Sequence, residues 1–97
     1  MELNMLYDIA SAPTATNSVI LLHPQDNVAV ARVALAEGQP FELGGSLVIT
    51  QQPIPAGHKV AICRVPRGER VLRYGNVIGF ATRDIDPGEH VHLQNLG

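Results

Sequence analysis

The sequence predicts a small all-β domain with little helix, and two observations carry that prediction. Hydrophobic residues make up 45% of the 97 residues but aromatic residues only 4%, so aliphatic side chains must fill the core. Branched aliphatic side chains favour strands. The apolar runs are also short and end at Pro or Gly corners, and no segment has the period of a long, capped helix. A chain of this length forms one domain with one modest core.

A local repeat organises the chain from residue 35 onward. An apolar residue is followed by two loop residues, a Gly, two mostly polar residues and a second apolar residue. This pattern occurs four times, at residues 35–41, 54–60, 65–71 and 85–91. Gly supplies the positive φ of a tight turn, and Pro fixes φ at a corner. We therefore expect each copy to be a turn and the strand that leaves it, with both apolar ends in one core.

The first eighteen residues are expected to form a flexible N-terminal arm, and residues 19–97 the domain. Leu3, Leu6 and Ile9 have helical spacing, and a run of small and polar residues follows at 11–18. The arm is therefore predicted to hold one short helical turn at most.

The first strand is predicted at residues 19–22, because Pro24 restricts His23 to extended geometry and removes a ladder donor. After a polar loop at 23–27, alternating Val and Ala predict a strand over 28–33. A short helix capped by Asp26 is the alternative. Asp26 and Asn27 are expected to fold the loop by bonding to their own backbone.

Further strands are predicted between the remaining corners. Gly44 and Gly45 form a two-residue hairpin turn between residues 41–43 and 46–50. The other expected strands cover residues 59–64, 70–73, 77–82 and 90–93.

The charges are unevenly distributed. A net charge of −2 and a pI near 6.0 argue against a nucleic-acid-binding protein. Residues 57–83 nevertheless contain a single acid, Glu69, and six basic side chains: Lys59, Arg64, Arg67, Arg70, Arg73 and Arg83. These cations form either a solvated strand face or a rim that attracts an anionic substrate or an acidic partner.

Cys63 is the sole cysteine, so no disulfide can form within the chain, and its apolar neighbours predict a buried thiol rather than a nucleophile. The sequence has neither a basic leader with a long apolar run nor about 20 consecutive apolar residues. No membrane association and a cytoplasmic location are therefore expected.

Histidines are the main candidates for chemistry, because the sequence contains no phosphate loop, dinucleotide fingerprint, zinc-binding cysteine pair or nucleophile elbow. His90 and His92 are two residues apart in a predicted strand, so both project to one face and could share a metal. A further ligand would have to come from His23, Asp26, His58 or another chain. The alternative is a pair of solvated histidines.

Other polar residues lie near the predicted corners. His58 and Lys59 follow Gly57, where they could meet a carboxylate or a phosphate. Arg73 and Tyr74 could add a guanidinium and a phenol to the same rim, although Tyr74 also suits the edge of the core. No acid–base pair is assembled by spacing, so no catalytic residue is assigned and a complete active site is not expected.

Four stretches, HPQDNVAVA (23–31), IPAGHKVA (54–61), RYGNVIG (73–79) and ATRDIDPGEHVH (81–92), resemble the small SAF-type (β-clip) domain of the altronate and galactarate dehydratase family. The resemblance covers nearly all of residues 19–96 in the family's order. The last turn alone recurs in many SAF domains, whereas the set is specific.

The resemblance implies a role in lyases that eliminate water from sugar acids, or sulfite from sulfolactate. The small unit is then a noncatalytic N-terminal domain or subunit, and a large component carries the chemistry with a divalent metal, for which iron is one candidate. The residues that match the small unit's rim are His23, Asp26, Asn27, His58, Lys59, Tyr74, His90 and His92. No cofactor is assigned to this chain itself.

Two departures and two alternatives accompany the resemblance. Gln94 stands where the family often has a third alternating His, and the arm is longer than the family's usual start. The alternatives are a free-standing SAF-type module that binds carbohydrate or protein, and an autonomous metalloenzyme. A homo-oligomer also stays open.

Overall fold

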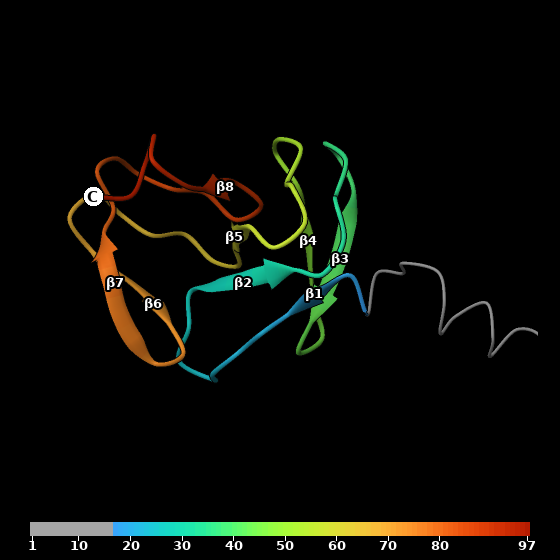
Figure 1. Ribbon diagram of the computed structural model, residues 1–97, viewed down its shortest axis with the longest axis horizontal. Helices are drawn as coiled ribbons and strands as arrows, with labels where there is room; N and C mark the ends of the chain where they lie inside the picture. The colour runs from blue at the N-terminus through green and yellow to red at the C-terminus, as the bar shows by residue number, and fades with distance from the viewer. Residues whose placement is uncertain (1–16) are drawn as a thin grey trace, which may run out of the picture.

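The computed structural model describes residues 17–97, and in this range the chain is all-β, as predicted (Figure 1). The range contains no helix, and therefore none that is long and apolar enough to cross a membrane. Its eight strands are β1 (Val19–Ile20), β2 (Val28–Ala31), β3 (Pro40–Leu43), β4 (Ser46–Ile49), β5 (Lys59–Ala61), β6 (Arg70–Arg73), β7 (Asn76–Phe80) and β8 (His90–Val91). The predicted arm lies outside the described residues except for its last two.

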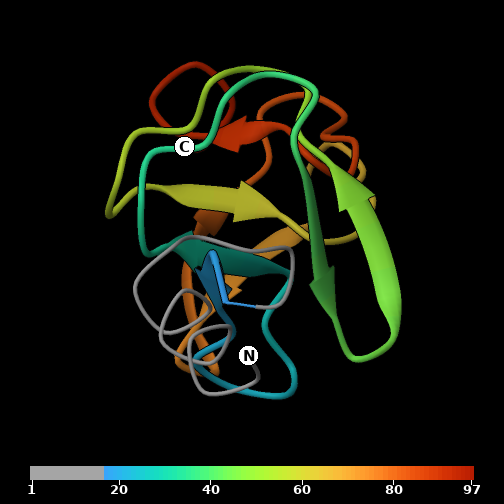
Figure 2. The same cartoon turned by 90° about the vertical axis from the view of Figure 1, so that its right-hand side faces the viewer.

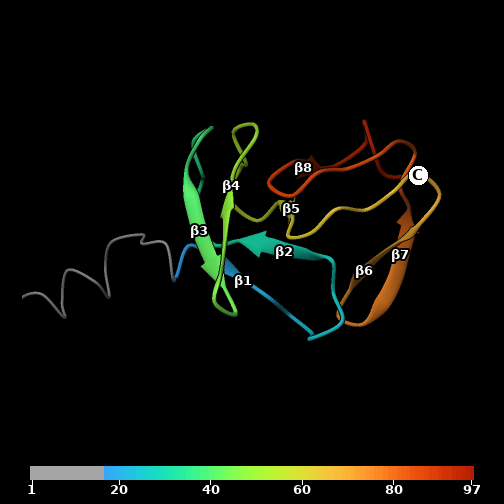
Figure 3. The ribbon, with the colours of Figure 1, turned by 180° about the vertical axis from the view of Figure 1, so that it is seen from behind.

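The strands form one central sheet and two hairpins. The central sheet is antiparallel, with the order β1-β2-β5-β8. The β3–β4 hairpin lies beside one end of this sheet and the β6–β7 hairpin beside the other, so the sheet stands between them (Figures 1 and 3). An end-on view shows β2, β5 and β8 stacked in this order (Figure 2). The strand preferred over a helix at residues 28–33 is therefore confirmed.

All four copies of the local repeat are turns, as predicted. Their glycines, Gly38, Gly57, Gly68 and Gly88, have φ values of 77°, 82°, 87° and 90°. The apolar residues that begin the copies pair with one another in isolated bridges, Leu35 with Ile54 and Val65 with Ile85. Each of these side chains is at most 2% exposed.

The repeat extends to whole halves of the domain. We call residues 28–58 the first half and residues 59–91 the second half. In the first half Gly57 N donates to Ala31 O, and in the second Gly88 N donates to Ala61 O. Each hairpin is closed in the same way, because Gly38 N donates to Thr50 O and Gly68 N to Ala81 O. The backbone hydrogen bonds thus describe one motif used twice.

The core consists of two clusters that largely follow the two halves, except that Val60 packs in the first cluster and Val28 in the second. The first surrounds Phe41 and includes Leu35, Val48, Ile54 and Val60. The second contains only aliphatic side chains: Val28, Ala61, Val65, Val71, Ala81, Ile85 and Val91. Complete burial of a Val, Ile or Phe side chain contributes about 1.5–3 kcal/mol. Two small aliphatic clusters therefore stabilise a chain with few aromatic residues.

Six strands are shorter than predicted. β2 ends at Ala31, β4 at Ile49 and β7 at Phe80, each one or two residues before the predicted end. β5 ends at Ala61, opposite Val28, the first residue of β2. β1 ends at Ile20, although β2 continues beyond its partner Val30 to Ala29 and Val28. β8 ends at Val91, because His92 N donates to the side chain of Asn95 and the chain turns there. The hairpin at Gly44 and Gly45 is confirmed, with Leu43 opposite Ser46.

Cys63 is exposed, so the prediction of a buried thiol is wrong. The thiol was placed in a strand over residues 59–64, but β5 ends at Ala61 and Cys63 lies in the bend that follows. Partial burial still raises the pKa of this thiol. A raised pKa lowers the fraction of reactive thiolate at neutral pH.

Candidate functional site

Three of the four histidines converge on one place. The ligand nitrogens of His58, His90 and His92 all lie within 4.8 Å of one another. His58 Nδ1 is 2.9 Å from His90 Nε2. The centroid of the His92 ring lies 5.0 Å from that of His58 and 5.3 Å from that of His90. We call these three residues the histidine cluster; His23 is not part of it.

Strand pairing in the central sheet explains the convergence. β5 pairs with β8 in an antiparallel register that sets Val60 opposite His90. His58 directly precedes β5 and His92 directly follows β8, so both lie just beyond the paired residues Lys59 and Val91. Residues opposite one another in antiparallel strands project to the same face. The cluster therefore forms where the end of the first half meets the end of the second.

Side-chain amides hold the backbone of the two C-terminal histidines. His90 N donates to Gln52 Oε1 at 2.8 Å, and His92 N donates to Asn95 Oδ1 at 3.0 Å. The carbonyl of His90 accepts from both Gln94 Nε2 and Asn95 Nδ2. Asn95 is completely buried. Gln94, at the position where the resemblance leads one to expect a third His, thus supports the backbone of the first.

The environment of the cluster disfavours a charged imidazole at His90. Burial lowers the pKa of His90 below its ordinary value, and His58, His92 and Lys59 lower it further. The two ion pairs within residues 17–97 lie elsewhere and both use Arg64, so no carboxylate in this range pairs with the cluster. A neutral imidazole offers a lone pair to a metal or a proton.

A second group of the predicted site residues lies at the tip of the β6–β7 hairpin. The buried carboxylate of Asp26 accepts hydrogen bonds from Tyr74 N and Gly75 N, each at 2.8 Å. Tyr74 has φ of 57° and Gly75 of 72°, which is a two-residue turn with both central residues left-handed. Asp26 therefore stabilises an unfavourable conformation at Tyr74.

Asn27 holds the neighbouring strand. It accepts a hydrogen bond from Leu72 N and donates one to Arg70 O, both at 2.8 Å. The expectation that Asp26 and Asn27 bond to their own loop is therefore wrong. The backbone groups that they bond to are more than 40 residues away in the sequence, and only the folded hairpin brings those groups into reach.

His23 also lies at this tip. A Cβ on Gly75 would stand 3.1 Å from the His23 ring, so the imidazole packs against the turn backbone. Its Nδ1 accepts a hydrogen bond from Gln25 N. The predicted rim is thus divided into the histidine cluster with Lys59 on one side and the hairpin tip with His23, Asp26, Asn27 and Tyr74 on the other.

Arg73 connects the two groups electrostatically. Lys59 is half-buried in β5, opposite Val30 on one side and Val91 on the other. Burial, and after it the nearby guanidinium of Arg73, lower the pKa of Lys59. Neither cation forms an ion pair with an acid of residues 17–97. Two cations that lie close together without an acid favour the binding of an anion.

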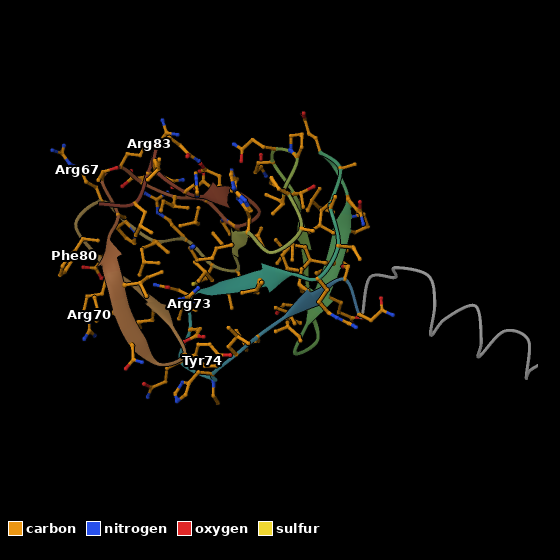
Figure 4. All side chains as sticks on the ribbon, in the orientation of Figure 1. Arg67, Arg70, Arg73, Tyr74, Phe80 and Arg83 are labelled. Atoms are coloured by element: carbon orange, nitrogen blue, oxygen red, sulfur yellow. The ribbon has the colours of Figure 1, made fainter. Side chains whose placement is uncertain are left out.

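The basic segment covers one surface of the second half. Of its arginines, Arg64 pairs with Asp84 and Asp86, at 3.1 and 3.2 Å. The N–H of Arg67, followed by Arg64, lowers the pKa of Asp84. Figure 4 shows side chains on and around the β6–β7 hairpin. Arg73 points toward β2. The others point away from the central sheet: Arg67, Arg70, Tyr74, Phe80 and Arg83.

Apolar side chains are exposed among these cations. Tyr74 is 62% exposed, Phe80 51% and Val77 45%. We call the surface formed by Arg67, Arg70, Tyr74, Val77 and Phe80 the hairpin face. Tyr74 was predicted from the sequence, whereas Phe80 and Val77 were missed, because the strand pattern does not show which face of a two-stranded hairpin is covered.

Comparison with known proteins places the chain in a family. Residues 17–97 match the family model described as the altronate/galactarate dehydratase SAF domain. The altronate dehydratase of Escherichia coli (strain K12) is 42% identical over 76 residues, which are 78% of this chain and 15% of that enzyme. The galactarate dehydratase (L-threo-forming) of the same bacterium is 39% identical over 80 residues, 80% of this chain and 15% of the enzyme.

A shorter relative is matched over a larger share of its own length. The (2R)-sulfolactate sulfo-lyase subunit alpha of Chromohalobacter salexigens is 44% identical over 43 residues, which are 44% of this chain and 46% of that subunit. The chain thus spans a small part of each dehydratase and about half of this subunit. Because the family model covers residues 17–97, the chain belongs to the SAF-domain family of the altronate and galactarate dehydratases.

Proposed function

We propose that the chain is the small, noncatalytic component of a lyase that eliminates water or sulfite from a sugar acid or a similar 2-hydroxy carboxylate. One observation carries the proposal. The residues that match make up most of this chain but only 15% of the altronate dehydratase, and a related sequence is named as a subunit of a sulfo-lyase. The elimination chemistry is then the task of a large component, together with the divalent metal expected there.

The acids of the described residues give the histidine cluster no carboxylate partner. Elimination next to a carboxylate needs a base for the proton and an acid for the leaving group. Asp26 is occupied by two turn amides, and Asp84 and Asp86 pair with Arg64. Glu89 accepts a hydrogen bond from Asp86 N. None of these acids is poised beside the histidine cluster as an acid–base partner.

The cations and histidines suggest what the chain contributes instead. Lys59 and Arg73 would attract the carboxylate of the substrate, and the histidine cluster lies next to Lys59 in the same pair of strands. Covering these groups with a large component would exclude water and strengthen each electrostatic contact with the substrate.

The hairpin face is the surface that we propose for docking. Exposed aromatic and aliphatic side chains surrounded by arginines are typical of protein interfaces. The arginines favour an acidic surface on the large component. The apolar residues of the hairpin face account for three of the exposed large hydrophobic side chains in residues 17–97.

Copurification with a large component tests the proposal. The chain should copurify with a polypeptide of several hundred residues encoded beside it, and lyase activity on altronate, galactarate or sulfolactate should fall when the chain is omitted. Unchanged activity without the chain, or carbohydrate binding by the isolated chain with no second polypeptide, would overturn it in favour of a free-standing binding module.

A further inference from the structure

We infer that His58, His90 and His92 form a binding site for one divalent transition-metal ion of the zinc, iron, cobalt or nickel type. The sequence suggested only a pair of histidines with an undetermined third ligand. The structure supplies that ligand from a different part of the chain, because His58 is 32 residues away from His90 and reaches it across β5 and β8. The site itself does not depend on the proposed lyase function.

The distances fit three ligands around one ion. A zinc–nitrogen bond is about 2.0–2.1 Å long, so two nitrogens bound to one ion lie about 2.9–3.4 Å apart for angles between 90° and the tetrahedral value. His58 Nδ1 and His90 Nε2 lie 2.9 Å apart, and all three ligand atoms are within 4.8 Å of one another. The His92 nitrogen completes the set of three ligands once it lies within the same range of the other two.

A hydrogen bond between two histidines would explain only part of this arrangement. One protonated and one unprotonated nitrogen would account for the contact of His58 with His90. It would not account for His92, whose ring lies within 5.3 Å of both other rings and makes no hydrogen bond with any side chain of residues 17–97. A common ion gives all three rings a partner.

The donor set selects the class of metal. Imidazole nitrogen binds zinc, iron, cobalt, nickel and copper, whereas magnesium and calcium prefer oxygen ligands. Three protein ligands leave at least one position open for water or another molecule. If the proposed function holds, that position suits a hydroxyl or carboxylate oxygen of the substrate, because Lys59 adds positive charge near His90.

Calorimetry on the isolated chain tests the site. The 97-residue chain, expressed without a polyhistidine tag and stripped with a chelator, is titrated with Zn²⁺ and Co²⁺. One ion should bind per chain, and His58→Ala, His90→Ala and His92→Ala should each weaken binding at least tenfold. His23→Ala is the matched control, because His23 packs against Gly75 outside the cluster; its affinity should stay within twofold of the unsubstituted chain.

A second measurement uses the unsubstituted chain, so a folding defect in a variant cannot affect it. In nuclear magnetic resonance spectra, Zn²⁺ should shift the ring signals of His58, His90 and His92 and leave those of His23 in place. Absence of saturable binding, equal weakening by His23→Ala, or a shift at His23 alone would overturn the metal site. Failure of copurification with a large component would overturn the proposed function and leave the metal site standing.

Discussion

The two halves of the domain have the same backbone motif and differ in their side chains. The turn of the β3–β4 hairpin consists of Gly44 and Gly45, and no side chain of residues 17–97 bonds to it. The turn of the β6–β7 hairpin has Tyr74 in place of the first Gly and is held by Asp26. The first hairpin contains the acid Glu42, whereas Arg70 and Arg73 make the second basic.

The comparison separates the residues that form the fold from the residues that form the candidate site. Corners and bridges recur in both halves because positive φ and apolar burial are required at each of them. The histidine cluster has no counterpart within one half, since it needs the end of β5 beside β8. The repeat therefore forms the backbone framework, and the residues of the candidate site lie where the two halves differ.

Replacing the equivalent glycines Gly57 and Gly88 by alanine should give the largest difference in unfolding free energy between the two halves. A Cβ at Gly88 would overlap the carbonyl oxygen of Ile49, whereas at Gly57 it would meet nothing within 4 Å. Gly88→Ala is expected to cost about 3–5 kcal/mol of unfolding free energy, through overpacking added to the left-handed strain. Gly57→Ala should cost about 1–2 kcal/mol, from the strain alone. Urea denaturation measures both, and equal losses would contradict the assigned packing.

Removal of the Asp26 clamp should weaken only the second hairpin. Asp26→Ala is expected to lower the unfolding free energy by about 2–3 kcal/mol, because two amide hydrogen bonds to a carboxylate are lost. Tyr74→Gly, which copies the turn of the first hairpin, should be neutral or stabilise by up to about 1 kcal/mol. Denaturation of both variants checks this, and a loss below about 0.5 kcal/mol for Asp26→Ala would refute the clamp.

Equivalent surface substitutions test which hairpin docks. Phe80→Glu places a negative charge in the hairpin face, and affinity for the proposed large component should fall at least tenfold, which is about 1.4 kcal/mol. Leu47→Glu is the matched control, because Leu47 is 63% exposed on the other hairpin. Surface plasmon resonance compares the two, and the idea fails if Leu47→Glu weakens binding as much as Phe80→Glu.

The smallest expected effect concerns the bend after each central strand, where the second half has Cys63 and the first has the half-buried Val33. Burial raises the pKa of the Cys63 thiol, which lowers the thiolate fraction at neutral pH. Alkylation by iodoacetamide should therefore be slower than that of a free cysteine at pH 7.5, and its rate should keep rising above the pH at which the rate for a free cysteine levels off. Alkylation faster than that of free cysteine at pH 7.5 would contradict the environment assigned to Cys63.

Local chemistry explains what could be predicted. The four glycine corners, the Gly44–Gly45 hairpin and β6 (Arg70–Arg73) follow from turn preferences and from short apolar runs. The ends of β5 and β8 could not be predicted, because β5 stops opposite Val28, the first residue of β2, and β8 stops where His92 N bonds to Asn95. For the same reason Cys63 was placed in a strand that does not extend to it.

The sequence by itself determined the all-β class, the positions of the turns and the family, because these depend on residues close together in the chain. Only the tertiary structure decided which distant groups meet. The antiparallel neighbours of β5 bring His58 to His90 and His92, and the folded second hairpin brings Tyr74 to Asp26. Contacts over 30 or more residues depend on strand order, and no local pattern in this chain specifies that order.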